Sequence, residues 1–311
     1  MAYIMRNNKS GSKEGIIFDT ERLSVYDGPG LRTVIFLKGC FLNCIWCHSP
    51  ESIKPLPQLA FYESKCIFCG KCIQICPNHV HDIDKKGKRI VKWNKCKLCG
   101  KCIQTCYSGA LKIIGERITL ETLFKYIKRD KIFYEESGGG VTFSGGEPTY
   151  QIDYLYEIIQ LCKEEGIHTA VETCGYFDFN RIRKILDFTD LFLYDLKCMN
   201  NENHKKYTGV SNLIILENLK KLVKEKKRII ISVPIVPGIN SSKNNIFRTF
   251  EFTYNLGLKE IRLLDFNRLA GSKYKCLGRR YRFEHLRPLG DKWKELVNDI
   301  GRKFDLKVKF Q

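Results

Sequence analysis

The chain has 311 residues, of which 43% are hydrophobic and 28% are charged, so it can bury one large core, or one core with a small appended module. No run approaches the roughly 18 consecutive apolar residues of a membrane span, and the first residues lack the apolar core of a signal peptide, which excludes a membrane protein and predicts a cytoplasmic one. The formal charge of +19 is compatible with nucleic acid, an acidic protein partner or a lysine-rich genome, and it does not choose between them.

Fifteen cysteines are an unusual number for a chain of this length. A reducing cytosol does not keep thiols as structural disulfides, so metal binding or catalysis is the expected use. Eleven of the cysteines lie between Cys40 and Cys106, which concentrates the chemistry in the first third of the chain.

The first predicted strand, residues 31–37, leads into a loop that carries Cys40, Cys44 and Cys47 in the spacing C-x3-C-x2-C. Three thiolates cannot saturate the four irons of a cubane [4Fe–4S] cluster, so one iron would keep an open position for an outside ligand, as catalytic metal sites do. Three ordinary thiols in a loop are the alternative. The spacing favours a catalytic cluster, with these three cysteines as catalytic metal ligands.

Two near-copies of one motif follow, CIFCGKCIQICPNHV from Cys66 and CKLCGKCIQTCYSGA from Cys96, and their offset of thirty residues indicates an internal duplication. Each copy reads C-x2-C-x2-C-x3-C, in which three cysteines of one copy and the last of the other hold each [4Fe–4S] cluster. Two zinc sites are the alternative, but they would leave a cysteine of each copy unused. The predicted ligand sets are Cys66, Cys69, Cys72 and Cys106 for one cluster, and Cys96, Cys99, Cys102 and Cys76 for the other.

Beyond this module, β-branched runs alternate with amphipathic helical patterns, which predicts an α/β fold with a parallel sheet or a β/α barrel of about six units. The predicted strands after residues 31–37 are residues 141–144, 168–174, 190–196, 228–236 and 260–266. The predicted helices are residues 154–166, 212–227 and 244–257.

Polar or glycine-rich signatures directly follow several of these strands. They are the GGEP sequence at Gly145–Pro148, ETCG at Glu172–Gly175, DLK at Asp195–Lys197, the Pro237–Gly238 pair and Asn267. Because the carboxyl ends of barrel strands carry the active site, we expect these signatures and the Cys40 loop to converge in space.

Together these motifs resemble those of the radical S-adenosylmethionine (SAM) enzymes. More narrowly, LSVYDGPGLRTVIFLKGCFLNCIWCHSPES, SGGEP, VETCGYF, YDLKCMNNENHKKYTGVSN and VPGIN resemble the activating enzymes of glycyl radical enzymes, over about Gly15 to the C-terminus. The resemblance implies a partial, TIM-like (β/α)6 barrel made of residues 1–60 and 111–311, with residues 61–110 inserted as a ferredoxin-like domain. It also implies three [4Fe–4S] clusters in all.

The resemblance implies the following activity. The open iron of the Cys40, Cys44 and Cys47 cluster binds the amino and carboxylate groups of SAM, and one electron cleaves the sulfonium bond. The resulting 5′-deoxyadenosyl radical abstracts hydrogen from a backbone glycine of a partner glycyl radical enzyme. Cluster and cofactor bring the chemistry, while the protein supplies orientation and excludes water.

Cofactor contacts are implied motif by motif. Gly145 and Gly146 let the backbone approach the methionine moiety, and Glu147 with main-chain carbonyls takes its amino group. Thr173 and Asp195 resemble positions that bind the cofactor, and a monovalent cation is expected near Glu172 and Asp195. The remaining implied contacts are Lys197 with the carboxylate or ribose, and Trp46 and Leu196 lining the adenosyl site. For each of these contacts a structural role, such as a helix cap or core packing, is the alternative.

The chain also departs from the family pattern. Ser232 stands where relatives commonly have an arginine two residues before proline, and Asn267 stands where the family usually has a histidine near the cofactor. An asparagine amide still hydrogen-bonds through both ends, so Asn267 stays a cofactor candidate. Asp27–Gly30 looks like the family's DGPG turn, which lies near the substrate peptide; a simple turn is an equally good interpretation of those residues alone.

Three other functions fit parts of the sequence. A radical enzyme that modifies another peptide or protein usually carries its auxiliary cysteines after the barrel. A non-catalytic electron-transfer protein has no use for the three-cysteine loop or GGEP. A nucleic-acid enzyme would interleave its basic residues with stacking aromatics, whereas LKKLVKEKKR from Leu219 reads as a solvated helix face. The expected partners are therefore a glycyl radical enzyme and a flavodoxin or ferredoxin electron donor, with no nucleic acid and no membrane.

Overall fold

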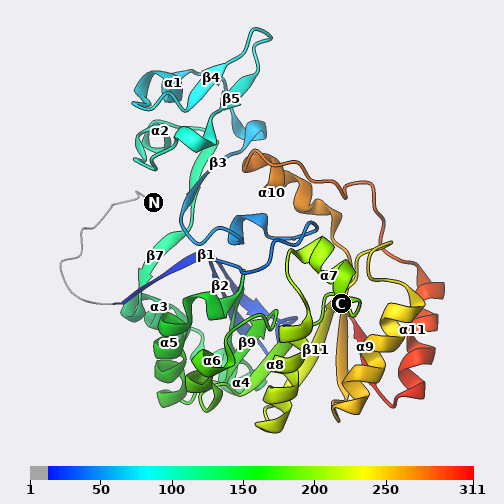
Figure 1. Ribbon diagram of the computed structural model, residues 1–311. Helices are drawn as coiled ribbons and strands as arrows, with labels where there is room; N and C mark the ends of the chain where they lie inside the picture. Colours follow the sequence, from blue (N-terminus) through cyan, green and yellow to red (C-terminus); the bar gives the residue numbers. More distant parts are fainter. Residues whose placement is uncertain (1–12) are drawn as a thin grey trace.

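The computed structural model describes residues 13–311, so the N-terminal stretch on which the predicted absence of a signal peptide rests lies outside it. Within this range the chain forms an α/β fold around one nine-stranded sheet (Figure 1). The strand order is β13-β12-β11-β10-β9-β8-β2-β1-β7. All neighbours from β2 to β13 are parallel, whereas β1 pairs antiparallel with both β2 and β7, which makes the sheet mixed.

The main-sheet strands are β1 (Glu14–Ser24), β2 (Arg32–Leu37), β7 (Glu116–Thr119), β8 (Gly140–Gly145), β9 (Thr169–Thr173), β10 (Leu191–Asp195), β11 (Ile229–Pro234), β12 (Glu260–Leu264) and β13 (Lys307–Phe310). The helices around it are α3 (Leu120–Lys128), α4 (Lys131–Ser137), α5 (Ile152–Glu164), α6 (Phe179–Leu186), α7 (Asn201–Thr208), α8 (Leu213–Lys224), α9 (Lys243–Asn255), α10 (Gly271–Cys276) and α11 (Asp291–Lys303).

All six strands predicted from β-branched runs are present, as β2 and β8 to β12, and the three predicted helices are α5, α8 and α9. Their apolar faces build the main core between the sheet and the surrounding helices, where side chains such as Phe143, Phe192 and Phe250 are almost fully buried. Polar residues start the helices: Asp178 caps α6 and Ser242 caps α9 by accepting a backbone N–H from the first turn. No helix among the described residues is long and apolar enough to cross a membrane.

Residues 58–114 extend away from the main sheet (Figure 1). Their elements are β3 (Gln58–Phe61), α1 (Lys71–Ile75), β4 (His81–Ile83), β5 (Arg89–Val91), α2 (Lys101–Gln104) and β6 (Leu111–Ile114). β3 pairs with β6 where the chain leaves and rejoins the sheet, and β4 pairs with β5. This segment has an apolar cluster of its own, which includes Phe61, Val80, Val91 and buried cysteines.

The two cysteine motifs of this segment have the same backbone conformation. Phe68 and Leu98, at equivalent positions of the two copies, have φ of 56° and 54°, and each is followed by a left-handed glycine, Gly70 or Gly100, that begins a short helix. A side chain other than glycine at positive φ costs about 1–3 kcal/mol and persists where its surroundings require it. The duplication seen in the sequence is therefore a duplication of a constrained loop.

Candidate active site

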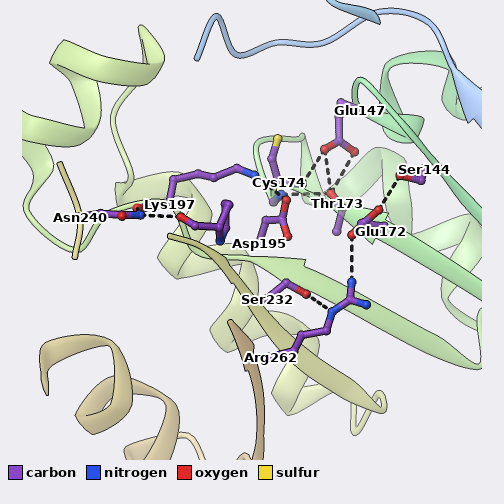
Figure 2. Close-up of polar contacts among 12 residues, drawn as sticks. Ser144, Glu147, Glu172, Thr173, Cys174, Asp195, Lys197, Ser232, Asn240 and Arg262 are labelled. Atoms are coloured by element: carbon purple, nitrogen blue, oxygen red, sulfur yellow. Dashed lines mark hydrogen bonds and ion pairs between the residues drawn. The ribbon is translucent and has the colours of Figure 1, made fainter. Parts of the chain in front are cut away.

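The predicted signatures meet at the carboxyl ends of the parallel strands. The Cys40 loop follows β2, Glu147 follows β8, Thr173 ends β9 and Asp195 ends β10. Figure 2 shows that side chains from the ends of β8, β9 and β10, between Glu147 and Lys197, point toward one another. The structure thus places one polar cluster at the edge of the sheet where barrel-type folds carry their active sites.

The loop with Cys40, Cys44 and Cys47 is fixed by main-chain hydrogen bonds. The N–H groups of Asn43 and Ile45 donate to carbonyls at the end of α7, over 2.8 and 3.0 Å. Burial raises the pKa of Cys44 well above its usual range and that of Cys47 to about 11. The thiols of this loop also influence one another electrostatically, and a low-dielectric pocket of this kind suits a metal-bound thiolate better than a free one.

A fourth thiol, Cys174 of the ETCG segment, lies beside Cys40. A hydrogen bond from Cys174 lowers the pKa of Cys40, and the same contact with burial raises the pKa of Cys174. Between residues 13 and 311, no three His, Cys, Asp or Glu side chains are grouped so that they could hold a single metal ion.

Glu147 is fully buried and ties the GGEP turn to the end of β9 (Figure 2). Its Oε1 accepts from the Thr149 N–H at 3.1 Å and hydroxyl at 2.7 Å and from the Thr173 hydroxyl at 2.9 Å, while Oε2 accepts from the Cys174 N–H at 2.8 Å. Both carboxylate oxygens are therefore engaged by the protein. Glu147 caps the turn that follows it, the structural alternative from the sequence, and it also positions two strand ends.

The GGEP turn requires glycine at its first position. Gly145 has φ of +123°, and a Cβ there would stand 2.2 Å from the Leu37 carbonyl oxygen, which is backbone and cannot move aside. We expect Gly145→Ala to lower the thermal unfolding midpoint and to prevent the turn from closing on the Cys40 loop. Gly138→Ala is the matched control, because Gly138 also has positive φ but a Cβ there meets open space. Equal midpoints for the two variants, measured by circular dichroism under anaerobic conditions, would contradict this role.

Asp195 and Lys197 form a buried ion pair of 2.5 Å, and each side chain is 14% exposed. Burial works to lower the pKa of Lys197, but the charges of Asp195 and of the nearby Cys44 outweigh it and raise that pKa, so the ammonium stays charged. Asn240 donates to the Lys197 carbonyl at 2.7 Å and holds the segment in place. Asp195 Oδ1 is buried and has no hydrogen-bond partner among residues 13–311, which leaves one acceptor of this carboxylate unused.

At the predicted cation position, the Glu172 carboxylate is paired with a cationic side chain of this chain, Arg262. Arg262 Nη2 donates to Glu172 Oε1 at 2.9 Å, and Ser144 donates to Glu172 Oε2 at 2.5 Å. With Lys197 on Asp195, both carboxylates have a fixed cationic partner from this chain.

Three of the predicted cofactor contacts lie apart from this polar cluster. Trp46 packs in an apolar cluster with Phe266 and Tyr274, in contact with Cys44, and Leu196 belongs to the main core. Asn267 is exposed, and its side chain accepts the Leu269 N–H at 2.9 Å as a helix cap. Asparagine commonly takes this capping role after a strand, which the sequence pattern did not distinguish from a cofactor contact.

Seven of the eight cysteines of the inserted segment lie in one of two groups. A small cavity is lined by Cys76 together with Cys96, Cys99 and Cys102, which combines the last cysteine of the first copy with three of the second. In the other group, Cys72 is influenced electrostatically by Cys66 and Cys106.

Arg89 lies beside the second of these groups and is 6% exposed. Its Nη2 donates to Cys72 Sγ at 2.9 Å, whereas Nε and Nη1 are buried without an acceptor among the described residues. The sequence does not identify Arg89, Cys174 and Arg262 as site residues. Their partners are far away in the sequence, and only the pairing of the strands shows that they are in contact.

The chain was compared with known proteins. A family model of the Radical SAM superfamily matches residues 34–250. The chain is 42% identical to the (2S)-3-sulfopropanediol dehydratase activating enzyme of Klebsiella oxytoca, over 89% of each chain. It is 39% identical to the choline trimethylamine-lyase activating enzyme of Oleidesulfovibrio alaskensis, over 95% of this chain and 97% of that one. It is also 40% identical to the trans-4-hydroxy-L-proline dehydratase activating enzyme of Clostridioides difficile, over 90% and 94%.

Proposed function

The chain belongs to the radical SAM superfamily and, within it, to the activating enzymes of glycyl radical enzymes, and on this basis we propose that it generates the glycyl radical of a partner enzyme. It reductively cleaves SAM, and the 5′-deoxyadenosyl radical takes hydrogen from a backbone glycine of the partner. The observation that carries this proposal is the position of the loop with Cys40, Cys44 and Cys47 beside the polar cluster at the strand ends. These thiols are partly buried, Cys40 contacts Cys174, and Cys44 acts electrostatically on Lys197.

These three thiols would hold a [4Fe–4S] cluster with one iron open to SAM. When bound, that cluster supplies the electron that breaks the sulfonium bond. The donor set fits, because it is made only of soft thiolates, which iron–sulfur clusters require, and because burial favours the metal-bound over the free form.

The neighbouring residues would bind and orient SAM. Gly145 and Gly146 bring main-chain groups close, while Glu147 and Thr173 act by holding that turn in place, since both oxygens of Glu147 are engaged. Lys197 offers a charged ammonium to the SAM carboxylate. The open Oδ1 of Asp195 is an acceptor for a hydroxyl or amino group. Trp46 and Leu196 would support the site through apolar packing and would not bind SAM through polar groups. Asn267 is also proposed as a contact, although its side-chain oxygen caps the next turn.

The domain organisation follows the same proposal. Residues 1–60 and 111–311 would form a partial barrel, and residues 61–110 a ferredoxin-like insertion with two further [4Fe–4S] clusters. The cavity lined by Cys76, Cys96, Cys99 and Cys102 supports the crossed ligand sets, because a thiol from each copy contributes to it. The two unpartnered nitrogens of Arg89 support an acceptor-rich group beside Cys72, which an iron–sulfur cluster would be.

The two inserted clusters would relay electrons from a flavodoxin or ferredoxin to the Cys40 loop. The lysines of α8, such as Lys220 and Lys224, are exposed on one face of an amphipathic helix, which supports a solvated or protein-facing surface over nucleic-acid binding. A cytoplasmic location is proposed on the number of free thiols.

The test of the function is a glycyl radical on a partner. The chain is reconstituted anaerobically with iron and sulfide, then reduced and mixed with SAM and the glycyl radical enzyme encoded beside it. We expect the electron paramagnetic resonance (EPR) signal of a glycyl radical on the partner, with methionine and 5′-deoxyadenosine formed. Cleavage of SAM with no radical on any co-encoded glycyl radical enzyme would favour the alternative, modification of another peptide or protein.

Arg89 gives a prediction for the inserted clusters. A positive charge and a hydrogen bond at a ligand sulfur stabilise the reduced cluster, so they raise its reduction potential. We expect Arg89→Gln to lower the potential of one cluster by about 59 mV, a tenfold change in the reduced-to-oxidised ratio for one electron. The measurement is a redox titration followed by EPR. Arg117→Gln removes the same charge at an exposed position outside this segment and should change nothing. Equal shifts in both variants would contradict the role of Arg89.

A further inference from the structure

Position 232 lacks the arginine that the family pattern leads one to expect, yet a guanidinium lies directly beside it. Ser232 on β11 and Arg262 on β12 are paired in register, and Arg262 Nε donates to Ser232 Oγ at 2.6 Å. Side chains at paired positions of neighbouring parallel strands point to the same face of the sheet. Both residues are buried, with Ser232 at 0% and Arg262 at 5% exposure. The small serine leaves the space over β11 that the arginine of the next strand fills (Figure 2).

The other two nitrogens of Arg262 reach two further parts of the site. Nη2 donates to Glu172 Oε1 at 2.9 Å, and Glu172 is held in turn by Ser144 of the strand that leads into GGEP. Nη1 donates to the Tyr26 carbonyl oxygen at 2.7 Å, which is 236 residues away in sequence. A single planar guanidinium thus joins β9, β11 and the loop between β1 and β2, and only arginine has the fork geometry for three such acceptors.

The loop that Arg262 reaches contains Asp27–Gly30. Its far side is fastened to the sheet separately, by the Thr142 hydroxyl donating to the Asp27 carbonyl at 2.7 Å and by Arg32 Nη1 donating to the Pro29 carbonyl at 3.1 Å. Tyr26 itself is 65% exposed, so the hydrogen bond from Arg262 to its carbonyl holds the solvent-facing start of this loop. Without this hydrogen bond, the first residues of the loop would have fewer hydrogen bonds to the strand ends.

We propose that Arg262 is a positioning residue that replaces, from the neighbouring strand, the arginine absent at position 232, and that it sets the loop at Tyr26–Gly30 for docking of the partner's glycine segment. The proposal rests on the proposed function for the identity of the docked segment. The expectation of an arginine at position 232 comes from the family resemblance, whereas the place of the guanidinium beside Ser232 rests on the contacts of Arg262 with Ser232, Glu172 and Tyr26. The Glu172 side chain is 20% exposed and that of Arg262 is 6% exposed, so removing the cation leaves a largely buried carboxylate without its partner and destabilises the strand ends.

The test is an exchange of the two side chains. In the sheet order β12-β11-β10-β9, position 232 lies one strand nearer to Glu172 than position 262 does, so an arginine there can reach the same carboxylate. Four variants are compared with the wild type: Arg262→Ser, Ser232→Arg, the double exchange of both, and Arg262→Lys. The readouts are the thermal unfolding midpoint, SAM cleavage without a partner, and glycyl radical yield against partner concentration.

We expect Arg262→Ser to lower the unfolding midpoint and to raise the partner concentration for half-maximal radical yield about tenfold. SAM cleavage in the absence of the partner should fall by a smaller factor, because Glu172 also loses its cation. The double exchange should restore both the midpoint and the partner dependence. Arg262→Lys should recover little, because an ammonium cannot bridge three separated acceptors.

Two results would overturn the proposal: a double exchange that is no better than Arg262→Ser in either readout, or an Arg262→Ser variant with unchanged partner dependence. Absence of SAM cleavage by the wild type would contradict the proposed function instead. In that case the unfolding midpoints would still decide whether arginine at 232 substitutes for arginine at 262.

Discussion

Replacing Cys44 by alanine is expected to abolish glycyl radical formation while leaving the rest of the chain folded. Two thiols cannot hold a cubane cluster beside Asp195 and Lys197, so SAM would have neither its iron nor its electron there. Bound iron should fall from about twelve to about eight atoms per chain, since the two clusters proposed for residues 61–110 would use other cysteines. The measurements are iron analysis after anaerobic reconstitution and EPR of the partner.

The matched control for this experiment is Cys162→Ala. Cys162 is a fully buried cysteine of α5 in the main core, and its environment is apolar, so its loss removes only packing. That variant should keep its iron and its activity, at a stability cost of about 1 kcal/mol. A Cys44→Ala protein that keeps full iron, or that still forms a glycyl radical, would contradict the assignment of the Cys40 loop as the catalytic cluster site.

The second large effect is expected for Glu147→Gln, which replaces one carboxylate oxygen of a fully buried side chain by an NH2 group. Oε1 and Oε2 each accept a backbone N–H, from Thr149 and Cys174, so either orientation of the amide leaves one of these donors facing another donor. Such an unsatisfied buried donor costs about 1–3 kcal/mol, and the lost charge adds to it. We expect a lower thermal unfolding midpoint and loss of the SAM-dependent change in the EPR spectrum.

Glu165→Gln is the control for that substitution. Glu165 forms surface ion pairs with Lys128 and Lys131 at the end of α5, where an exposed pair contributes about 0–1 kcal/mol. The same chemical change should therefore leave both the unfolding midpoint and the SAM response close to the wild type. If Glu147→Gln behaved like Glu165→Gln, the carboxylate would not be what joins the GGEP turn to β9.

Much of the sheet is predictable from sequence because its central strands are short β-branched runs buried on both faces. β7 (ERIT) and β13 (KVKF) were not predicted, since they are short edge strands that carry exposed charges and have no apolar run. β1 was missed for a related reason: its second half is largely exposed, so no sustained alternation marks it as a strand. These strands make the sheet mixed, a feature that a simple alternation of strands and helices does not contain.

The candidate site, too, has one part that the sequence predicts and one part that it does not. Motif residues such as Glu147, Thr173 and Asp195 are predictable because each lies at the end of a strand or just beyond it, and parallel strands place their carboxyl ends together. Arg262 was not, because it lies in the middle of a strand and gains its partners only through the register of β11 and β12 and the fold of a loop more than 200 residues away. Position 232 carries no cation, but Arg262 supplies a positive charge at the same place in the site.

The most direct measurement of the central claim is the EPR spectrum of the reduced, reconstituted chain before and after addition of SAM, together with its iron content. We expect three [4Fe–4S] clusters, of which one changes its EPR signal on SAM binding, and we expect this cluster to be absent from the Cys44→Ala variant. Only two clusters per chain, or three clusters that are all indifferent to SAM, would contradict it.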